Sequence, residues 1–228
     1  MPEGCFFYYI TDRTAFPGDE FERRRHLLAK IAEAACAGVD YIQLREKDLP
    51  TRELESLAAE AMRIIQQLRT ENRELRTSLL INSRTDVALA AVADGVHLPS
   101  NDILAEDARA AWHKTCGHNQ SVRENLTQEP LTGVSCHSPQ EVAQAEANAA
   151  TFAIFGPVFG KKDALGVLAT GLDLLRQACR VKIPVLALGG ITLQNAESCL
   201  HAGAAGIAAI RLFQENDIAA IVHKLREN

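Results

Sequence analysis

The sequence of 228 residues lacks the marks of several protein classes. Its six cysteines include no C-x-x-C pair, no run of about 18 apolar residues occurs, and no basic region precedes an apolar stretch at the N-terminus. A chain of this length does not depend on disulfides for its stability, so we expect the cysteines to be reduced. The other two absences predict a cytoplasmic protein without a membrane span.

The chain also lacks an excess of positive charge. Its net charge is −5, which gives no overall attraction for nucleic acid or for an anionic membrane. Hydrophobic residues make up 47% of the chain and charged residues 23%, as in an ordinary globular enzyme. We therefore expect a small-molecule ligand held at a local site, and neither nucleic acid nor membrane as a partner.

Eight short apolar runs alternate with amphipathic stretches, which is typical of βα units around a parallel sheet. The runs predict strands at residues 6–10, 39–44, 78–81, 95–98, 131–135, 151–155, 184–188 and 206–210. The stretches between them predict helices at residues 20–37, 51–69, 85–93, 105–114, 139–149, 171–179, 193–201 and 216–226. Eight such units close naturally into an α/β fold, a single (βα)8 TIM barrel over residues 1–228. A doubly wound sheet is the alternative, but the glycine-rich dinucleotide fingerprint is missing after the first run.

The residues that follow the strands decide the chemistry, because barrel enzymes build their sites at the C-terminal ends of the strands. After the second strand, alternation places Gln43, Arg45 and Lys47 on one side, where two cations and an amide suit an anion. A solvated strand end with a chance basic cluster is the alternative. Asn82 follows the third strand, and Asp102 follows the fourth as either a metal ligand or the N-cap of the next helix.

The fifth strand brings Ser135 and His137 to the same end of the barrel. An imidazole there has a pKa near working pH and could transfer a proton, although it could also be structural. Cys136, between them, points to the opposite face of the strand, so a Cys–His nucleophilic dyad is not expected.

Three further segments could contact an anion. The loop at residues 160–168 contains Lys161 and Lys162, and it either closes over a ligand or forms an exposed basic turn. Gly189 and Gly190 follow the seventh strand, and Ile210 and Arg211 follow the eighth. This pair of positions forms the usual phosphate site of such barrels.

Several of these motifs, taken in order, resemble the thiamine-phosphate synthase/TenI superfamily. They are Gln-Leu-Arg-Glu-Lys at 43–47, Ile-Asn-Ser-Arg-Thr-Asp-Val-Ala at 81–88, Asp-Gly-Val-His-Leu at 94–98, Gly-Val-Ser-Cys-His-Ser at 133–138, Phe-Gly-Pro-Val-Phe at 155–159 and Leu-Gly-Gly-Ile at 188–191. The resemblance covers nearly the whole chain. It implies an enzyme of thiamine biosynthesis that acts on a thiazole phosphate.

The resemblance implies one of two activities. Synthases couple the thiazole phosphate to a pyrimidine diphosphate, release pyrophosphate and need magnesium held by two carboxylates. Here Ser83 stands at the first carboxylate position, while Asp102 keeps the second, and the Thr-x-Thr segment before the paired lysines is absent. Tautomerases of the TenI branch carry a non-acidic residue between Asn and Arg and a Leu-Pro-Ser after strand four, as this chain does.

The departures favour a TenI-like thiazole tautomerase that needs no cofactor. In that interpretation His137, beside Ser135, shuttles the proton, Arg45 and Lys47 face the carboxylate, and Gly189, Gly190, Ile210 and Arg211 hold the phosphate. The alternative is a synthase that uses Asp102 and Mg, with Gln43, Arg45, Lys47, Asn82 and Lys162 around the pyrophosphate. A non-catalytic relative that binds thiamine phosphates is a third interpretation, and the sequence leaves a homo-oligomer open.

Overall fold

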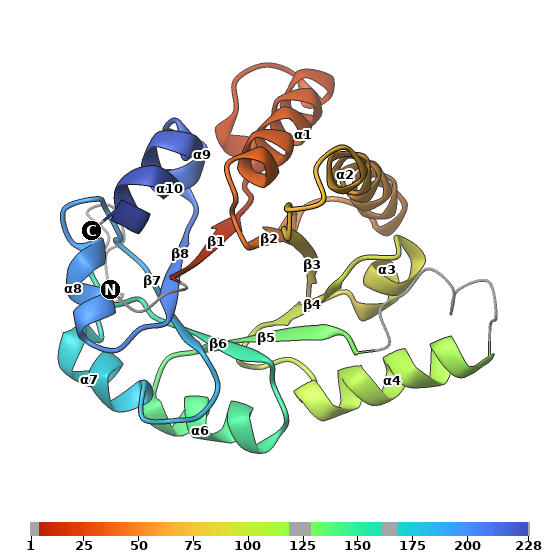
Figure 1. Cartoon of the computed structure of the whole chain (residues 1–228). Coiled ribbons are helices and arrows are strands. Elements are labelled where there is room, and N and C mark those ends of the chain that lie inside the picture. Colours follow the sequence, from red (N-terminus) through yellow and green to blue (C-terminus); the bar gives the residue numbers. More distant parts are fainter. Residues whose placement is uncertain (1–4, 119–128, 161–167, 228) are drawn as a thin grey trace.

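Eight parallel strands form a closed barrel in the computed structural model, which describes residues 5–118, 129–160 and 168–227 (Figure 1). The strands pair in chain order, and β8 returns to pair with β1. They are β1 (Phe6–Ile10), β2 (Tyr41–Leu44), β3 (Ser78–Asn82), β4 (Gly95–Leu98), β5 (Leu131–Cys136), β6 (Phe152–Phe155), β7 (Val185–Leu188) and β8 (Gly206–Ala209). The predicted TIM barrel is confirmed.

Helices surround the strands, as the view along the barrel shows (Figure 1). They are α1 (Glu20–Cys36), α2 (Thr51–Glu71), α3 (Thr85–Ala90), α4 (Ala105–His118), α6 (Pro139–Ala147), α7 (Gly171–Ala178), α8 (Ala196–His201), α9 (Arg211–Gln214) and α10 (Ile218–Glu227), with a 3-10 helix η1 (Arg13–Ala15) after β1. None of the helices within the described ranges combines the length and apolarity needed to cross a membrane.

Each predicted strand is present with its ends shifted by at most two residues, and the helices differ more. Helix α8 begins at Ala196 instead of residue 193, because the side chain of Asn195 accepts the Thr192 N–H at 2.8 Å and holds a turn ahead of the helix. Two short helices, η1 and α9, were not predicted. Each has only three or four residues, which is too short for a helical hydrophobic pattern.

Two hydrophobic clusters follow from the alternation of side chains along the strands. The larger cluster fills the space between the strands and the helices and includes Trp112, which is fully buried. The smaller cluster lies inside the barrel and consists of Tyr8, Ile10, Leu80, Phe152, Ile154, Leu186 and Ala208. Because apolar side chains fill the lower interior, polar residues that point inward are confined to the C-terminal end of the barrel.

Candidate functional site

Gln43 and Asn82 meet at the C-terminal end of the barrel. The side-chain amide of Gln43 donates to Asn82 Oδ1 at 3.2 Å, and Asn82 is paired in register with His97 on the next strand. Gln43 is buried and Asn82 half-buried. Inward-facing positions on β2, β3 and β4 therefore form a continuous polar surface above the apolar interior.

His97 joins that surface to β5 and β1. Its Nε2 lies 2.8 Å from the hydroxyl oxygen of Ser135, and its Nδ1 lies 3.0 Å from the hydroxyl of Tyr8. Burial, with a smaller contribution from the positive charge of Arg45, lowers the pKa of His97 from 6.5 to about 3. The ring is therefore neutral at physiological pH, and both of its nitrogens already have partners.

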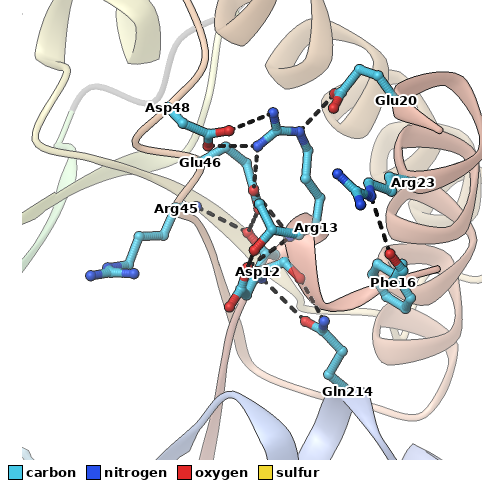
Figure 2. A network of polar contacts seen from close by, with 11 residues as sticks. Asp12, Arg13, Phe16, Glu20, Arg23, Arg45, Glu46, Asp48 and Gln214 are labelled. Atoms are coloured by element: carbon cyan, nitrogen blue, oxygen red, sulfur yellow. Dashed lines mark hydrogen bonds and ion pairs between the residues drawn. The ribbon is translucent and has the colours of Figure 1, made fainter. Parts of the chain in front are cut away.

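Arg45 and Lys47 follow β2 beyond its last residue, Leu44. The Arg45 side chain points away from the polar contacts made by its neighbours (Figure 2). Its positive charge contributes to the lowered pKa of the buried His97. Lys47 is exposed and lines a cavity of about 270 Å³, here called the β2–β4 cavity, whose other walls are Leu44, Glu46, Leu49, Leu54, Asn82, Ser83, Arg84 and Pro99. The structure thus brings Lys47 and Asn82, but not Arg45, to the walls of one cavity, and binding of an anion there stays a prediction.

Asp102 contacts Ser83, one of the walls of this cavity, and itself lines a second cavity of about 100 Å³ together with Pro99 and Ser135. The hydroxyl of Ser83 donates to Asp102 Oδ2, and Asp102 Oδ1 accepts the N–H of Ile103 at 2.8 Å. Helix α4 begins only at Ala105, so the N-cap alternative for Asp102 is wrong. The two positions that the family resemblance links to a metal are therefore adjacent in space.

The donor set at this point fits magnesium only in part. Among the residues that the structure describes, no three His, Cys, Asp or Glu side chains gather in a way that could hold a metal by themselves. Asp102 supplies a carboxylate, while Ser83 and Asn82 supply neutral oxygens. Magnesium is commonly held by one or two carboxylates together with the phosphates of a substrate, so one carboxylate is enough when a phosphorylated ligand completes the shell.

His137 lies just beyond β5 and is exposed. Its Nδ1 lies 2.6 Å from the carbonyl oxygen of Gly156, and its backbone N–H donates to Glu141 at 2.8 Å. The contact of Nδ1 orients the ring, and the backbone contact fixes the main chain at this point. Cys136 is buried, and burial raises the pKa of its thiol to about 12, which agrees with the prediction that it packs against the helices and is not a nucleophile.

Gly189 and Gly190 lie directly against the segment that follows β6. Both have positive φ, 97° and 64°, and a Cβ on Gly189 would lie 2.5 Å from the Cα of Pro157. A Cβ on Gly190 would lie 2.8 Å from the Cβ of Phe159. Glycine is required here because two loops approach each other closely, and the backbone of both glycines is left near the C-terminal end of the barrel.

Ile210 and Arg211 follow β8, where Ile210 is the N-cap of the four-residue helix α9. The Arg211 side chain is 70% exposed, and its Nε lies 3.9 Å from Glu215. Arg211 therefore lies at the surface of the β8 end. Lys161 and Lys162 fall outside the described residues, so the expected contacts of Lys162 and the closure of the 160–168 loop stay predictions.

Sequence reasoning missed the segment after β1. Thr11 and Arg13 are buried, and both contact Glu46, which lies between Arg45 and Lys47. Gln214 of α9 contacts the same segment at Asp12. A signal was present: Thr-Asp-Arg directly follows an apolar strand, as the other polar strand ends do.

Comparison with known proteins gives concordant matches. A family model described as thiamine monophosphate synthase matches residues 7–213. The thiamine-phosphate synthase of Syntrophomonas wolfei subsp. wolfei is 36% identical over 225 residues, which is 96% of this chain and 94% of the relative. That of Roseiflexus sp. is 36% identical over 91% of this chain and 77% of its own length. The solved thiamine phosphate pyrophosphorylase of Pyrococcus furiosus superposes with a TM-score of 0.71 at 31% identity, covering 97% of this chain and 94% of that one.

Proposed function

Because the chain belongs to the thiamine monophosphate synthase family, an enzyme family of thiamine biosynthesis, we propose that it is a thiamine-phosphate synthase. In this reaction a pyrimidine diphosphate is coupled to a thiazole phosphate with release of pyrophosphate. The names and the near-complete coverage of the relatives support this alternative better than the tautomerase that the sequence departures favoured.

The observation that carries the proposal is the β2–β4 cavity with Asp102 beside it. Lys47 and Asn82 bring a cation and an amide to its walls, and Ser83, which also lines it, holds the carboxylate of Asp102 next to it. This combination suits a diphosphate with its metal: the ammonium and the amide contact phosphate oxygens, and the carboxylate is a ligand for magnesium. A proton shift on a thiazole would need no carboxylate at this place.

Magnesium would be held by Asp102, with Asn82 and Ser83 as neutral oxygen donors, and it would neutralise charge that develops on the departing pyrophosphate. The chain's own residues then bind and orient. Gln43 is buried and fixed to Asn82, so it holds that amide in one orientation at the diphosphate. Arg45 and Lys47 add positive charge from β2, and Lys162 is proposed to do so from the loop after β6.

The second substrate is proposed to bind across the barrel end. The thiazole phosphate would lie against the backbone of Gly189 and Gly190, with Ile210 and Arg211 at the β8 end. Ser135, whose hydroxyl is held by His97, lies between the two phosphate sites along the strand order and would donate to or accept from the bound substrate. Positioning of two reactants in this way removes most of the entropic barrier of a coupling reaction.

The experiment is an assay of the purified chain on both substrates, with and without magnesium. We expect magnesium-dependent release of pyrophosphate. Asp102→Asn should lower kcat/KM by roughly 100-fold or more, as loss of a charged ligand at a reacting phosphate does. Asp107→Asn, an exposed carboxylate in the first turn of α4, is the matched control and should change little.

The tautomerase remains a second candidate for two reasons. Ser83 stands where the synthases have one of their two metal-binding carboxylates, and the exposed ring of His137 is held at a strand end. Isomerisation of the thiazole carboxylate phosphate without pyrophosphate release would favour it. In that case His137→Asn should lower the rate by roughly 10²–10⁴-fold. Binding of thiazole phosphate without turnover of either substrate would instead favour a non-catalytic relative.

A further inference from the structure

Arg13 is the centre of a buried polar network beside the candidate site (Figure 2). Its side chain is 5% exposed and forms ion pairs with three carboxylates, from Glu20 at 2.7 Å, Glu46 at 3.3 Å and Asp48 at 2.7 Å. The contact with Asp48 is bidentate, since the two terminal nitrogens donate to its two oxygens at 2.7 and 2.8 Å. Such a fork fixes direction as well as distance.

This network holds the segment at residues 45–48 at three points, which are Arg45, Glu46 and Asp48. The N–H of Arg45 donates to the hydroxyl oxygen of Thr11 at 3.0 Å, and that hydroxyl donates to Glu46 at 2.5 Å. Glu46 also accepts the backbone N–H of Arg13 at 3.0 Å, and Asp48 accepts the guanidinium. Arg45 and Lys47 are the two cations of the candidate diphosphate site on this segment. The network holds the backbone of Arg45 and the side chains of Glu46 and Asp48, which flank Lys47 in the sequence.

The contacts of Arg13 bear on the direction in which the side chains of residues 45–48 point. Glu46 and Asp48 contact Arg13 and Arg45 points away from it (Figure 2), while Lys47 lines the β2–β4 cavity, of which Glu46 is also a wall. The chain beyond Leu44 is no longer in a strand, so the sheet does not set the direction of these side chains. Instead, the ion pairs of Arg13 with Glu46 and Asp48 set their direction.

The same segment is tied to the other candidate phosphate site. Gln214 of α9 donates to the carbonyl of Asp12 at 2.6 Å and accepts the Asp12 N–H at 3.2 Å and the hydroxyl of Tyr9 at 2.9 Å. Helix α9 begins with Arg211. Residues 11–13 thus connect the β2 end, with Arg45 and Lys47, to the β8 end.

We propose that Arg13 is a positioning residue for binding of the diphosphate substrate: by holding Glu46 and Asp48 it directs Arg45 and Lys47 toward the pyrophosphate. This inference rests on the proposed function for the identity of the ligand. Without the Arg13 side chain, Asp48 is released, and Glu46 keeps its contacts with Thr11 and with the backbone N–H of residue 13 but loses its counter-charge. Both carboxylates then compete with the substrate for the charges of Arg45 and Lys47. Binding of the diphosphate is weakened, whereas the thiazole phosphate site is left in place.

The test compares Arg13→Met with Arg69→Met. Arg69 is the control because it too pairs with a carboxylate, Asp94 at 2.8 Å, and is partly buried, but that carboxylate precedes β4 at the opposite end of the barrel. For each protein we would measure kcat, the KM of each substrate, and the Kd of inorganic pyrophosphate with magnesium by calorimetry.

We expect Arg13→Met to raise the pyrophosphate Kd and the KM of the pyrimidine diphosphate by about tenfold or more, as removal of a supporting contact does. The KM of the thiazole phosphate should stay within about twofold, and Arg69→Met should leave all values within about twofold, because distant sites act independently. Arg13→Lys, which keeps the charge and loses the fork, should give an intermediate Kd.

A second variant covers the case in which Arg13→Met does not fold because Glu46 is left unpaired. Asp48 is 59% exposed, so Asp48→Ala should fold and raise the pyrophosphate Kd by about threefold or more. An unchanged Kd in folded Arg13→Met or Asp48→Ala would overturn the inference. If the wild type makes no product, the proposed function fails, while the pyrophosphate Kd still decides the role of Arg13.

Discussion

The Nε2 of His97 and the hydroxyl oxygen of Ser135 lie 2.8 Å apart at the C-terminal end of the barrel. His97 is 3% exposed, and its other nitrogen is held by the hydroxyl of Tyr8 from across the interior. A neutral imidazole has one donor and one acceptor, so the direction of the Ser135 hydroxyl is set by the tautomer of His97. His97 therefore orients a group at the site and is not itself a proton shuttle at neutral pH.

The buried state of His97 predicts a pH dependence of stability. Because burial lowers the pKa of His97 from 6.5 to about 3, the unfolded chain binds more protons than the folded one between these values. Stability therefore falls as the pH falls through this window, by up to about 1.4 kcal/mol per pH unit from this residue. We expect the stability advantage of the wild type over His97→Gln, measured by urea unfolding, to shrink as the pH is lowered from about 7 to about 4. A constant difference would contradict this.

The close approach of the loops after β6 and β7 predicts the effect of a methyl group. Gly189→Ala should destabilise the protein by about 3 kcal/mol or more, since left-handed strain adds to a contact with the Pro157 backbone. Gly171→Ala is the control, because Gly171 also has positive φ, 78°, but no atom of the described residues within 4 Å of an added Cβ, and should cost only about 1–2 kcal/mol. Chemical denaturation of both variants measures the difference. Equal losses of unfolding free energy in the two variants would show that the contact with Pro157 does not affect stability.

Much of the fold could be predicted because each strand is buried on both faces. Such strands appear as short apolar runs, and the run at 95–98 matches β4 residue for residue. The ends of helices were harder to predict. Side-chain contacts decide them, as Asn195 does before α8, and these contacts have no periodic signature.

The candidate site could be predicted only where its residues lie at the C-terminal ends of strands. Gln43, Asn82 and Ser135 lie where alternation puts them. The role of Glu46 could not be predicted, because its partners Thr11 and Arg13 are more than 30 positions away and alternation alone assigns Glu46 no contact. His97 and Tyr8 meet across 89 positions for the same reason: only closure of the barrel brings their inward faces together.

The exposed position of Arg211 predicts a change in binding without a change in stability. Its Nε lies 3.9 Å from Glu215 and its side chain is 70% exposed, so Arg211→Ala should alter the free energy of unfolding by less than about 0.5 kcal/mol. Affinity for the thiazole phosphate should fall about tenfold, since a charge-assisted contact is lost. Calorimetric titration measures this, with Arg176→Ala as control, another exposed arginine in a helical ion pair. Unchanged affinity would remove Arg211 from the phosphate site.

The contact between Ser83 and Asp102 predicts how a second carboxylate would act. In Ser83→Asp two carboxylates would face each other, and their repulsion should lower the melting temperature when magnesium is chelated. The backbone accepts the change, because Ser83 has a φ of 63° and aspartate is among the residues found most often in the left-handed region.

Magnesium should reverse this loss in Ser83→Asp and bind roughly tenfold more tightly than in the wild type, because affinity for hard cations rises with the number of charged ligands. The melting temperature of Ser83→Asn, which has the same shape without the charge, should not respond to magnesium more than that of the wild type. Melting curves with and without magnesium, together with calorimetric titration of the metal alone, separate the two variants. If both respond equally, the side chains at 83 and 102 do not share a cation, and the metal of the proposed reaction must then be held by the substrate phosphates and Asp102 without any contribution from residue 83.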